Sequence, residues 1–191
     1  MKNGKIFIIS GPSGVGKNTI VKGLLETPDL NLAIIKSYTT RLKRPSDDID
    51  QNYMFISVSQ FKELEEKGEI LESNFFNNNY YGSSKKEIRN KLDSGVNIIK
   101  DIDVNGGFFY KNNFSNATLI FVYSSLEKIR RRLEERKQNS VEEINDRLKT
   151  AEAELKQIPH YDFSVENVEG KPEIAIEKIA QIIRARSSED I

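Results

Sequence analysis

Short apolar runs alternate along the chain with longer stretches in which apolar residues recur every three or four positions. An apolar run of this length is typical of a buried strand, and a longer stretch is typical of a helix with one buried face. The pattern predicts strands at residues 5–10, 33–36, 96–101, 118–123 and 163–165, and helices at 17–26, 84–94, 126–137, 140–157 and 172–186. Because alternating strands and helices favour a parallel sheet covered on both faces, we expect an α/β fold with a three-layer core.

Residues 37–83 depart from this alternation. A polar and charged segment comes first, followed by the apolar alternation at 53–56 and a short helix that starts after Ser59 and ends at Gly68. A strand at 69–75 and an asparagine turn at 77–79 complete the segment. We therefore expect a small β-rich insertion in the core.

Local signals predict several helix ends. Ser84 is a suitable N-cap for the helix at 84–94, and Ser140 with Glu143 has the spacing of a capping box. The last helix has an apolar stripe made of Ile174, Ile176, Ile179, Ile182 and Ile183.

The first strand runs directly into a glycine-rich segment that is typical of phosphate binding. Its sequence is Gly11-Pro12-Ser13-Gly14-Val15-Gly16-Lys17-Asn18-Thr19. The glycines let the backbone curl so that successive N–H groups converge on an anion at the start of the next helix, and Lys17 adds a positive charge. An ordinary strand-to-helix turn is the alternative. Asn18 stands where a serine or threonine usually binds magnesium, and Thr19 follows it.

Composition limits the other possibilities. The chain has 191 residues, which suits one domain with insertions, and its 29 basic residues balance its 29 acidic ones. This balance argues against general binding of nucleic acid or of a membrane surface. The chain has no cysteine, which excludes disulfides and thiolate metal sites, and its first apolar run is too short for a signal peptide or a membrane span. We expect a cytoplasmic protein.

Ligands of a parallel α/β sheet bind beyond the carboxyl ends of its strands. Asp101 ends the strand at 96–101, so it is expected near the glycine-rich segment. We expect it to hold Mg²⁺ through water, although a helix cap is the alternative role.

A second set of residues points to a phosphorylated acceptor. Taken singly, each could be a solvated or packing residue, but their order and spacing along the chain resemble those of guanylate kinases nearly from end to end. The matching residues are Ser37, Arg41 and Arg44, then Tyr53, Glu72, Tyr81-Gly82-Ser83 and Asp101-Ile102-Asp103.

The resemblance implies a role for each of these acceptor residues. Ser37, Arg41, Tyr53 and Tyr81 match residues that hold the phosphate of GMP, and Glu72, Ser83 and Asp103 match residues that hold guanine. The residue types agree, because an arginine suits a phosphate dianion and a carboxylate accepts from the adjacent N–H donors of guanine.

The resemblance also implies a helical lid over the polyphosphate of ATP. Arg132, Arg136 and Arg147 match the lid arginines, and we expect Lys17, Arg44, Arg136 and Arg147 to be catalytic. Asn167 matches an asparagine at the adenine of ATP, although Val168 stands where the family usually has aspartate. The implied division is a P-loop core at 1–36, 84–125 and 156–191, a GMP-binding insertion at 37–83, and a lid at 126–155.

The expected reaction is transfer of the γ-phosphoryl group of ATP to GMP, and also to dGMP, in purine nucleotide metabolism. Three alternatives stay open from the residues themselves. They are a P-loop kinase for another phosphorylated acceptor such as a ribose phosphate, a non-catalytic module that binds a phosphorylated partner, and a nucleotide-hydrolysing switch.

Overall fold

The computed structural model describes residues 3–43, 53–76, 78–135 and 140–189. The chain forms two compact units. The smaller unit consists of Met1–Gly4 and Ala33–Ile98, and the larger unit of Lys5–Leu32 and Ile99–Ile191. The three-part division expected from the sequence stays a prediction. Among the described residues, no helix is long and apolar enough to cross a membrane.

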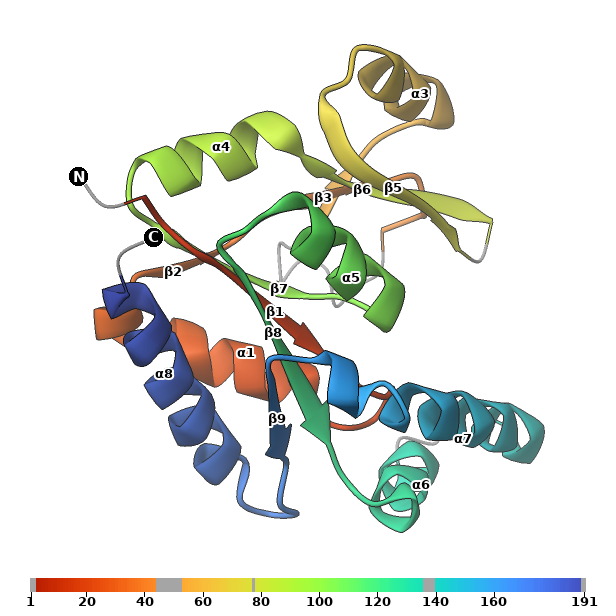
Figure 1. The fold of residues 1–191 in the computed structure, drawn as a ribbon. Helices are drawn as coiled ribbons and strands as arrows, with labels where there is room; N and C mark the ends of the chain where they lie inside the picture. Colours follow the sequence, from red (N-terminus) through yellow and green to blue (C-terminus); the bar gives the residue numbers. More distant parts are fainter. Residues whose placement is uncertain (1–2, 44–52, 77, 136–139, 190–191) are drawn as a thin grey trace. The chain divides into compact units, whose positions relative to one another are not determined.

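The main sheet has five strands in the order β2-β7-β1-β8-β9 (Figure 1). These are β2 (Leu32–Ile34), β7 (Asn97–Asp101), β1 (Ile6–Ser10), β8 (Ala117–Tyr123) and β9 (Phe163–Glu166). β1 pairs in parallel with β8, and β8 pairs in parallel with β9. Every residue of β1 is buried, as are the first six of β8. The α/β fold with a parallel sheet is therefore confirmed.

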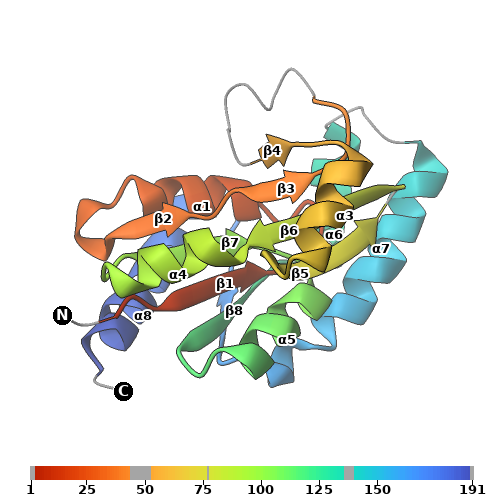
Figure 2. The same cartoon turned by 90° about the horizontal axis from the view of Figure 1, so that it is seen from above.

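Helices cover both faces of the sheet in the larger unit (Figures 1 and 2). α1 (Lys17–Leu25) and α8 (Pro172–Ser188) lie on one face, and α5 (Val104–Asn113) lies on the other. α1 and α8 approach closely at Gly23, where a Cβ would lie 2.4 Å from Cδ1 of Ile176. α1 ends before Pro28, which begins the short 3-10 helix η1 (Pro28–Leu30).

Two further helices of the larger unit pack against each other through their own apolar cluster. They are α6 (Leu126–Glu135) and α7 (Val141–Leu155), and the cluster consists of Ile129, Leu133, Ile144, Leu148 and Ala151. The predicted capping box is confirmed, because Ser140 and Glu143 bond each other's backbone N–H groups. The 3-10 helix η2 (Ile158–His160) follows α7.

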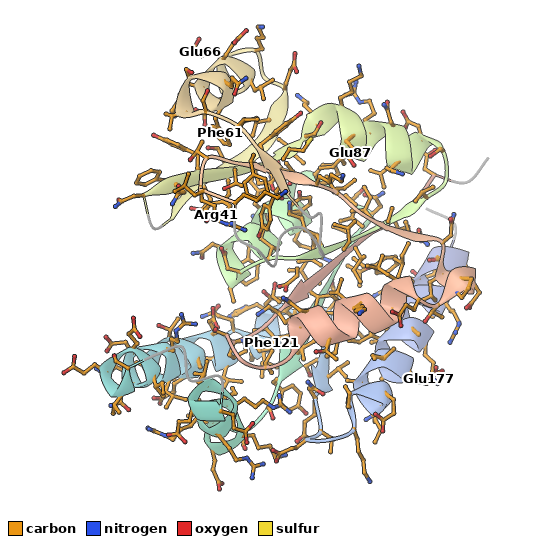
Figure 3. All side chains as sticks on the ribbon, turned by 180° about the vertical axis from the view of Figure 1, so that it is seen from behind. Arg41, Phe61, Glu66, Glu87, Phe121 and Glu177 are labelled. Atoms are coloured by element: carbon orange, nitrogen blue, oxygen red, sulfur yellow. The ribbon has the colours of Figure 1, made fainter. Side chains whose placement is uncertain are left out.

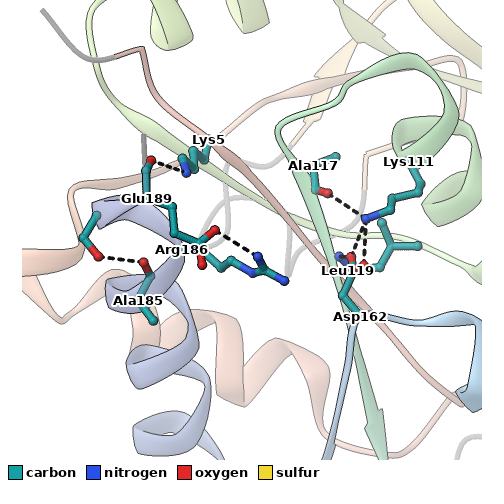
Figure 4. A network of polar contacts seen from close by, with 9 residues as sticks. Lys5, Lys111, Ala117, Leu119, Asp162, Ala185, Arg186 and Glu189 are labelled. Carbon is teal, nitrogen blue, oxygen red and sulfur yellow. Dashed lines mark hydrogen bonds and ion pairs between the residues drawn. The ribbon is translucent and has the colours of Figure 1, made fainter. Parts of the chain in front are cut away.

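Charged side chains form polar contacts that connect elements of the larger unit (Figure 4). Nζ of Lys111 lies 2.7 Å and 2.8 Å from the two carboxylate oxygens of Asp162, just before β9. The same carboxylate accepts the backbone N–H of Leu119 in β8 at 2.8 Å. Lys5, which is buried, donates from Nζ to the carbonyl of Glu189 at 2.8 Å. These contacts join α5, β8 and β9, and they fix the end of the chain beyond α8.

The smaller unit contains a four-stranded sheet in the order β4-β3-β6-β5. Its strands are β3 (Ser37–Thr39), β4 (Tyr53–Phe55), β5 (Ile70–Phe76) and β6 (Asn79–Ser84). Its helices are α3 (Val58–Glu66) and α4 (Lys85–Asp93), and Ser84 caps α4 as expected. Phe61 points from α3 onto the sheet, where it is fully buried and stacks on Tyr80 with ring centroids 5.2 Å apart (Figure 3).

The structure corrects several sequence-based predictions in the smaller unit. Residues 37–39, expected to be loop, form β3, and residues 79–84, for which no strand was predicted, form β6. The helix expected after Ser59 begins two residues earlier, at Val58, because Ser57 is its N-cap and shares a capping box with Gln60. β2 ends at Ile34 rather than at residue 36. Asn77 of the predicted turn lies outside the described residues.

Two corrections concern the larger unit. No element was predicted between residues 101 and 118, yet α5 occupies this segment despite Gly106 and Gly107. Ile174 was expected in the apolar stripe of α8 but is 37% exposed, whereas Ala175 and Ala180 are buried. The buried face of α8 therefore includes these two alanines and is rotated relative to the predicted isoleucine stripe.

The cap of α3 yields the first testable prediction. Ser57→Ala removes an Oγ that accepts the N–H of Gln60 at 3.2 Å, and it should lower the free energy of unfolding by about 1 kcal/mol. Glu66→Ala, at an exposed position of the same helix, is the control and should change it by less than about 0.5 kcal/mol. Urea denaturation of both variants measures the difference, and equal losses would show that Ser57 is not the cap.

Candidate active site

The glycine-rich segment forms a tight loop between β1 and α1. We call residues 11–17 the phosphate-binding loop. Gly11, Gly14 and Gly16 have φ values of 146°, 86° and 101°, which side-chain-bearing residues rarely adopt. A Cβ on Gly11 would also lie only 2.0 Å from the carbonyl oxygen of Val122. Gly16 is the N-cap of α1 and has no side chain to bond the first N–H groups of the helix, which leaves them available for an anion.

The side chain of Lys17 folds back over this loop. Its Nζ donates to the carbonyl of Gly11 at 2.6 Å and to that of Pro12 at 3.3 Å. Oδ1 of Asp101, at the end of β7, lies 3.9 Å from the same Nζ. The loop thus holds a positive charge beside the N–H groups of α1, as phosphate binding requires.

The two aspartates after β7 have different surroundings. The side chain of Asp101 is 28% exposed. Its pKa is raised above the ordinary value, because the effect of burial exceeds the lowering effect of the Lys17 charge. Asp103 is the N-cap of α5, because its Oδ1 accepts the N–H of Gly106 at 2.9 Å. The helix-cap alternative considered for Asp101 therefore applies to Asp103.

Three side chains from distant parts of the sequence contact the phosphate-binding loop. NH1 of Arg132 on α6 donates to the carbonyl of Val15 at 2.8 Å, and Nδ2 of Asn167 donates to the same carbonyl at 2.7 Å. NH1 of Arg147 on α7 donates to Oγ of Ser13 at 2.9 Å. The structure thus brings two of the predicted lid arginines to the loop.

A pocket of about 380 Å³ borders the loop in the larger unit. Its lining combines residues of the loop with an arginine, a carboxylate, an amide, a hydroxyl and apolar groups. The lining residues are Gly14, Gly16, Thr19, Arg132, Glu135, Asn167, Val168, Gly170 and Pro172. Its size and mixed lining suit a small organic ligand attached to a bound phosphate.

The predicted acceptor residues gather on one face of the smaller unit's sheet. Ser37 of β3 pairs with Tyr53 of β4 and with Ser83 of β6, and Tyr81 lies two residues before Ser83. Directly paired residues point to the same side of a sheet, and so do residues two apart on one strand. These four side chains therefore share a face.

Glu72 and Arg41 complete this cluster. Oγ of Ser83 donates to Oε1 of Glu72 at 2.6 Å. The guanidinium carbon of Arg41 lies 4.9 Å from the ring centroid of Tyr53, and the Tyr53 and Tyr81 rings are 6.2 Å apart in an edge-to-face arrangement. Figure 3 labels Arg41 beside this sheet. A carboxylate, a hydroxyl, an arginine and two phenols thus lie on a single surface.

The remaining predicted residues are placed as follows. Asn18 and Thr19 are exposed in the first turn of α1, and Asp101 and Asp103 belong to the larger unit. Arg44 and Arg136 lie outside the described residues.

Sequence reasoning missed Glu154, a half-buried carboxylate on α7. The pKa of Glu154 is raised above its ordinary value, chiefly by burial; the charge of Lys17 lowers it and that of Asp103 raises it further. Arg147 and Glu154 are seven positions apart and share a face of the helix. That spacing from a predicted catalytic arginine is the signal that could have identified Glu154.

Comparison with known proteins gives one consistent result. The family model for guanylate kinase matches residues 3–186. The chain is 38% identical to the guanylate kinase of Malacoplasma penetrans, covering 95% of this chain and 93% of that protein. It is 39% identical to that of Syntrophomonas wolfei, covering 96% and 93%. The crystal structure of guanylate kinase from Anaplasma phagocytophilum matches with a TM-score of 0.77 and 29% identity, covering 98% of this chain and 88% of that one.

The close contact at Gly11 yields a second testable prediction. Gly11→Ala combines an unfavourable φ with a clash against the backbone of Val122, so it should lower the free energy of unfolding by about 2–3 kcal/mol and weaken ATP binding. Gly68→Ala is the control, since Gly68 also has positive φ but no atom within 4 Å of its Cβ position. It should cost only about 1–2 kcal/mol. Equal losses in a denaturant titration would contradict the clash at Gly11.

Proposed function

Because the chain belongs to the guanylate kinase family, it is an enzyme that transfers a phosphoryl group from ATP to GMP, and we propose how its residues divide this work. The observation that supports the assignment most is the shared surface of Ser83, Glu72, Arg41 and the two tyrosines, because the arginine suits a phosphate dianion and the carboxylate suits the N–H donors of guanine.

The phosphate-binding loop and its neighbours form the proposed donor site. Backbone N–H groups of residues 13, 14, 16 and 17 and the start of α1 bind the β- and γ-phosphates of ATP, and Lys17 neutralises part of their charge. Asn18 and Thr19 extend this site along the first turn of α1. The pocket beside the loop receives the nucleoside, with Arg132 and Asn167 at its edge.

The residues around Asp101 fit a magnesium ion. Mg²⁺ prefers oxygen ligands and usually takes one or two carboxylates together with water and substrate phosphates. Asp101 supplies a partly exposed carboxylate beside Lys17, and Asn18 and Thr19 supply exposed amide and hydroxyl oxygens. We propose that Asp101 holds the ion through water. A bound Mg²⁺ would neutralise charge on the donor phosphates.

The proposed acceptor site uses the surface of the smaller unit. Ser37, Arg41, Tyr53 and Tyr81 bind the phosphate of GMP, with Arg44 as a further cation. Glu72 accepts from N1–H and the 2-amino group of guanine, and its bond with Ser83 fixes the carboxylate for that purpose. Asp103 is the third proposed contact to guanine. None of these groups recognises the 2′-hydroxyl in this assignment, so dGMP is also a proposed acceptor.

Transfer requires positioning and charge neutralisation rather than a covalent enzyme intermediate. An oxygen of the GMP phosphate attacks the γ-phosphorus, the bond to the β-phosphate bridging oxygen breaks, and ADP leaves. Lys17, Arg44, Arg136 and Arg147 are the proposed catalytic residues, because negative charge spreads over the migrating group and these cations can surround it. Residues 126–155 serve as the lid and residues 37–83 as the GMP-binding insertion in this proposal.

The cellular setting stays a prediction. The cytoplasm is the proposed location, and purine nucleotide metabolism is the proposed role, because the substrates GMP and ATP belong to it.

Glu72 provides the experiment that tests the acceptor assignment. Glu72→Gln removes a charged acceptor for guanine, and kcat/KM for GMP should fall by roughly 10- to 100-fold. IMP lacks the 2-amino group, so its kcat/KM should fall less. The measurement is a coupled assay of ADP formation with each acceptor.

Glu66→Gln is the control variant, because Glu66 is an exposed carboxylate on α3 of the same unit (Figure 3). It should leave both acceptors unaffected. An unchanged kcat/KM for GMP in Glu72→Gln would exclude Glu72 from base recognition.

A further inference from the structure

The side chain of Asn167 is committed to the phosphate-binding loop. Asn167 follows β9 and is 4% exposed. Its Nδ2 donates to the carbonyl of Val15 at 2.7 Å, across 152 positions of sequence. The same Nδ2 lies 2.5 Å from the point where a Cβ on Gly16 would be. The amide therefore occupies the space that the missing side chain of Gly16 leaves open, and its hydrogen bond restrains the middle of the loop.

The backbone of Asn167 is also fixed. Its N–H donates to the carbonyl of Tyr123 at 2.8 Å, which continues the pairing of β8 with β9. Its carbonyl accepts from Oγ of Ser124 at 3.4 Å. With the main chain held at both groups, the side chain can turn away only by giving up the carbonyl of Val15.

The remaining polar atom of Asn167 is covered by protein. Oδ1 is buried and has no hydrogen-bond partner among the described residues. Although Asn167 lines the pocket beside the loop, its Oδ1 is covered and its Nδ2 is bonded to Val15, so the amide offers little to an adenine base there. Its contact with the loop is the interaction that its position supports.

Arg132 shares the same acceptor. Its NH1 donates to the carbonyl of Val15 at 2.8 Å, and a carbonyl oxygen can accept two hydrogen bonds. Arg132 is partly exposed and is one of the proposed donor contacts, so binding of a phosphate can draw it from this carbonyl. Asn167 is buried, and it keeps the carbonyl bonded when Arg132 moves.

We propose that Asn167 is a positioning residue that holds the turn Gly14–Val15–Gly16 in its phosphate-binding conformation. It acts on the triphosphate tail through the loop and makes no contribution that depends on the base. This inference rests on the proposed use of the loop as the donor site.

Inorganic tripolyphosphate separates the two roles because it has no base. Asn167→Ala should weaken binding of tripolyphosphate and of ATP by the same factor, roughly 10-fold or more, as measured by calorimetry. It should also lower kcat, because a displaced loop misplaces the γ-phosphate. Calorimetric binding of GMP and thermal unfolding report whether the variant is folded.

Two further variants sharpen the test. Asn167→Leu has nearly the same shape and carries no charge, and it has no donor for Val15. It should show the same uniform loss, and it carries the test if the alanine variant does not fold. Asn113→Ala is the matched control, because Nδ2 of Asn113 donates to the carbonyl of Phe109 at 2.8 Å on an exposed part of α5. It should leave both affinities unchanged.

The outcomes are distinct. A loss confined to ATP, with tripolyphosphate binding unchanged, would overturn the inference and assign Asn167 to the base. Unchanged binding of both ligands would also overturn it. A wild-type protein that binds neither ligand would instead contradict the donor site itself. Wild-type binding of ATP without tripolyphosphate would show that the loop alone does not hold the phosphates, and would overturn the inference as well.

Discussion

A loop that binds phosphate through its backbone N–H groups has to leave those groups unbonded, so its carbonyl groups need other partners. In this protein many of the partners are side chains, although the carbonyl of Pro12 also accepts the N–H of Val15 at 3.1 Å. Lys17 bonds the carbonyls of Gly11 and Pro12, and Arg132 and Asn167 bond that of Val15. These donors oppose the tendency of a glycine-rich segment to adopt other conformations. The geometry of the donor site therefore depends on contacts made by residues far from it in sequence.

The same contacts connect the loop to the helices that carry two of the proposed lid arginines. Arg132 on α6 and Arg147 on α7 each bond a group of the loop, and α6 and α7 pack together through a shared apolar cluster. Because a hydrogen bond to a neutral carbonyl or hydroxyl is weaker than one to a phosphate, a bound nucleotide can take over these arginines. The loop thus holds these cations near the proposed site of the donor phosphates.

Sequence reasoning predicted the parts of the fold that have strong local signals. The buried strands, the loop after β1, and the capping box of Ser140 all follow from residues close together in the chain. β3 and β6 were missed because they are short or polar, and pairing between strands stabilises them rather than their own sequence. α5 was missed because its two glycines are unfavourable in a helix, although Gly107 packs closely against the hydroxyls of Ser10 and Tyr161.

The candidate site likewise contains residues that the sequence predicts and residues that it does not. The phosphate-binding loop is recognisable from its glycines, and the order of the acceptor residues follows the guanylate kinase pattern. The bond between Asn167 and Val15 could not be predicted, because it depends on the pairing of β9 with β8 beside β1. The only sequence signal for Glu154 is its helical spacing from Arg147, and many exposed carboxylates have such a spacing.

The most direct test of this account is the rate of ADP formation from ATP with no acceptor and with GMP, AMP or ribose 5-phosphate. Two pockets, one for the triphosphate and one for guanine monophosphate, predict rapid ADP formation with GMP, little with AMP or the sugar phosphate, and slow hydrolysis without an acceptor. Equal rates in all four reactions would contradict the account, because ATP cleavage would then be independent of the surface built around Glu72 and Arg41.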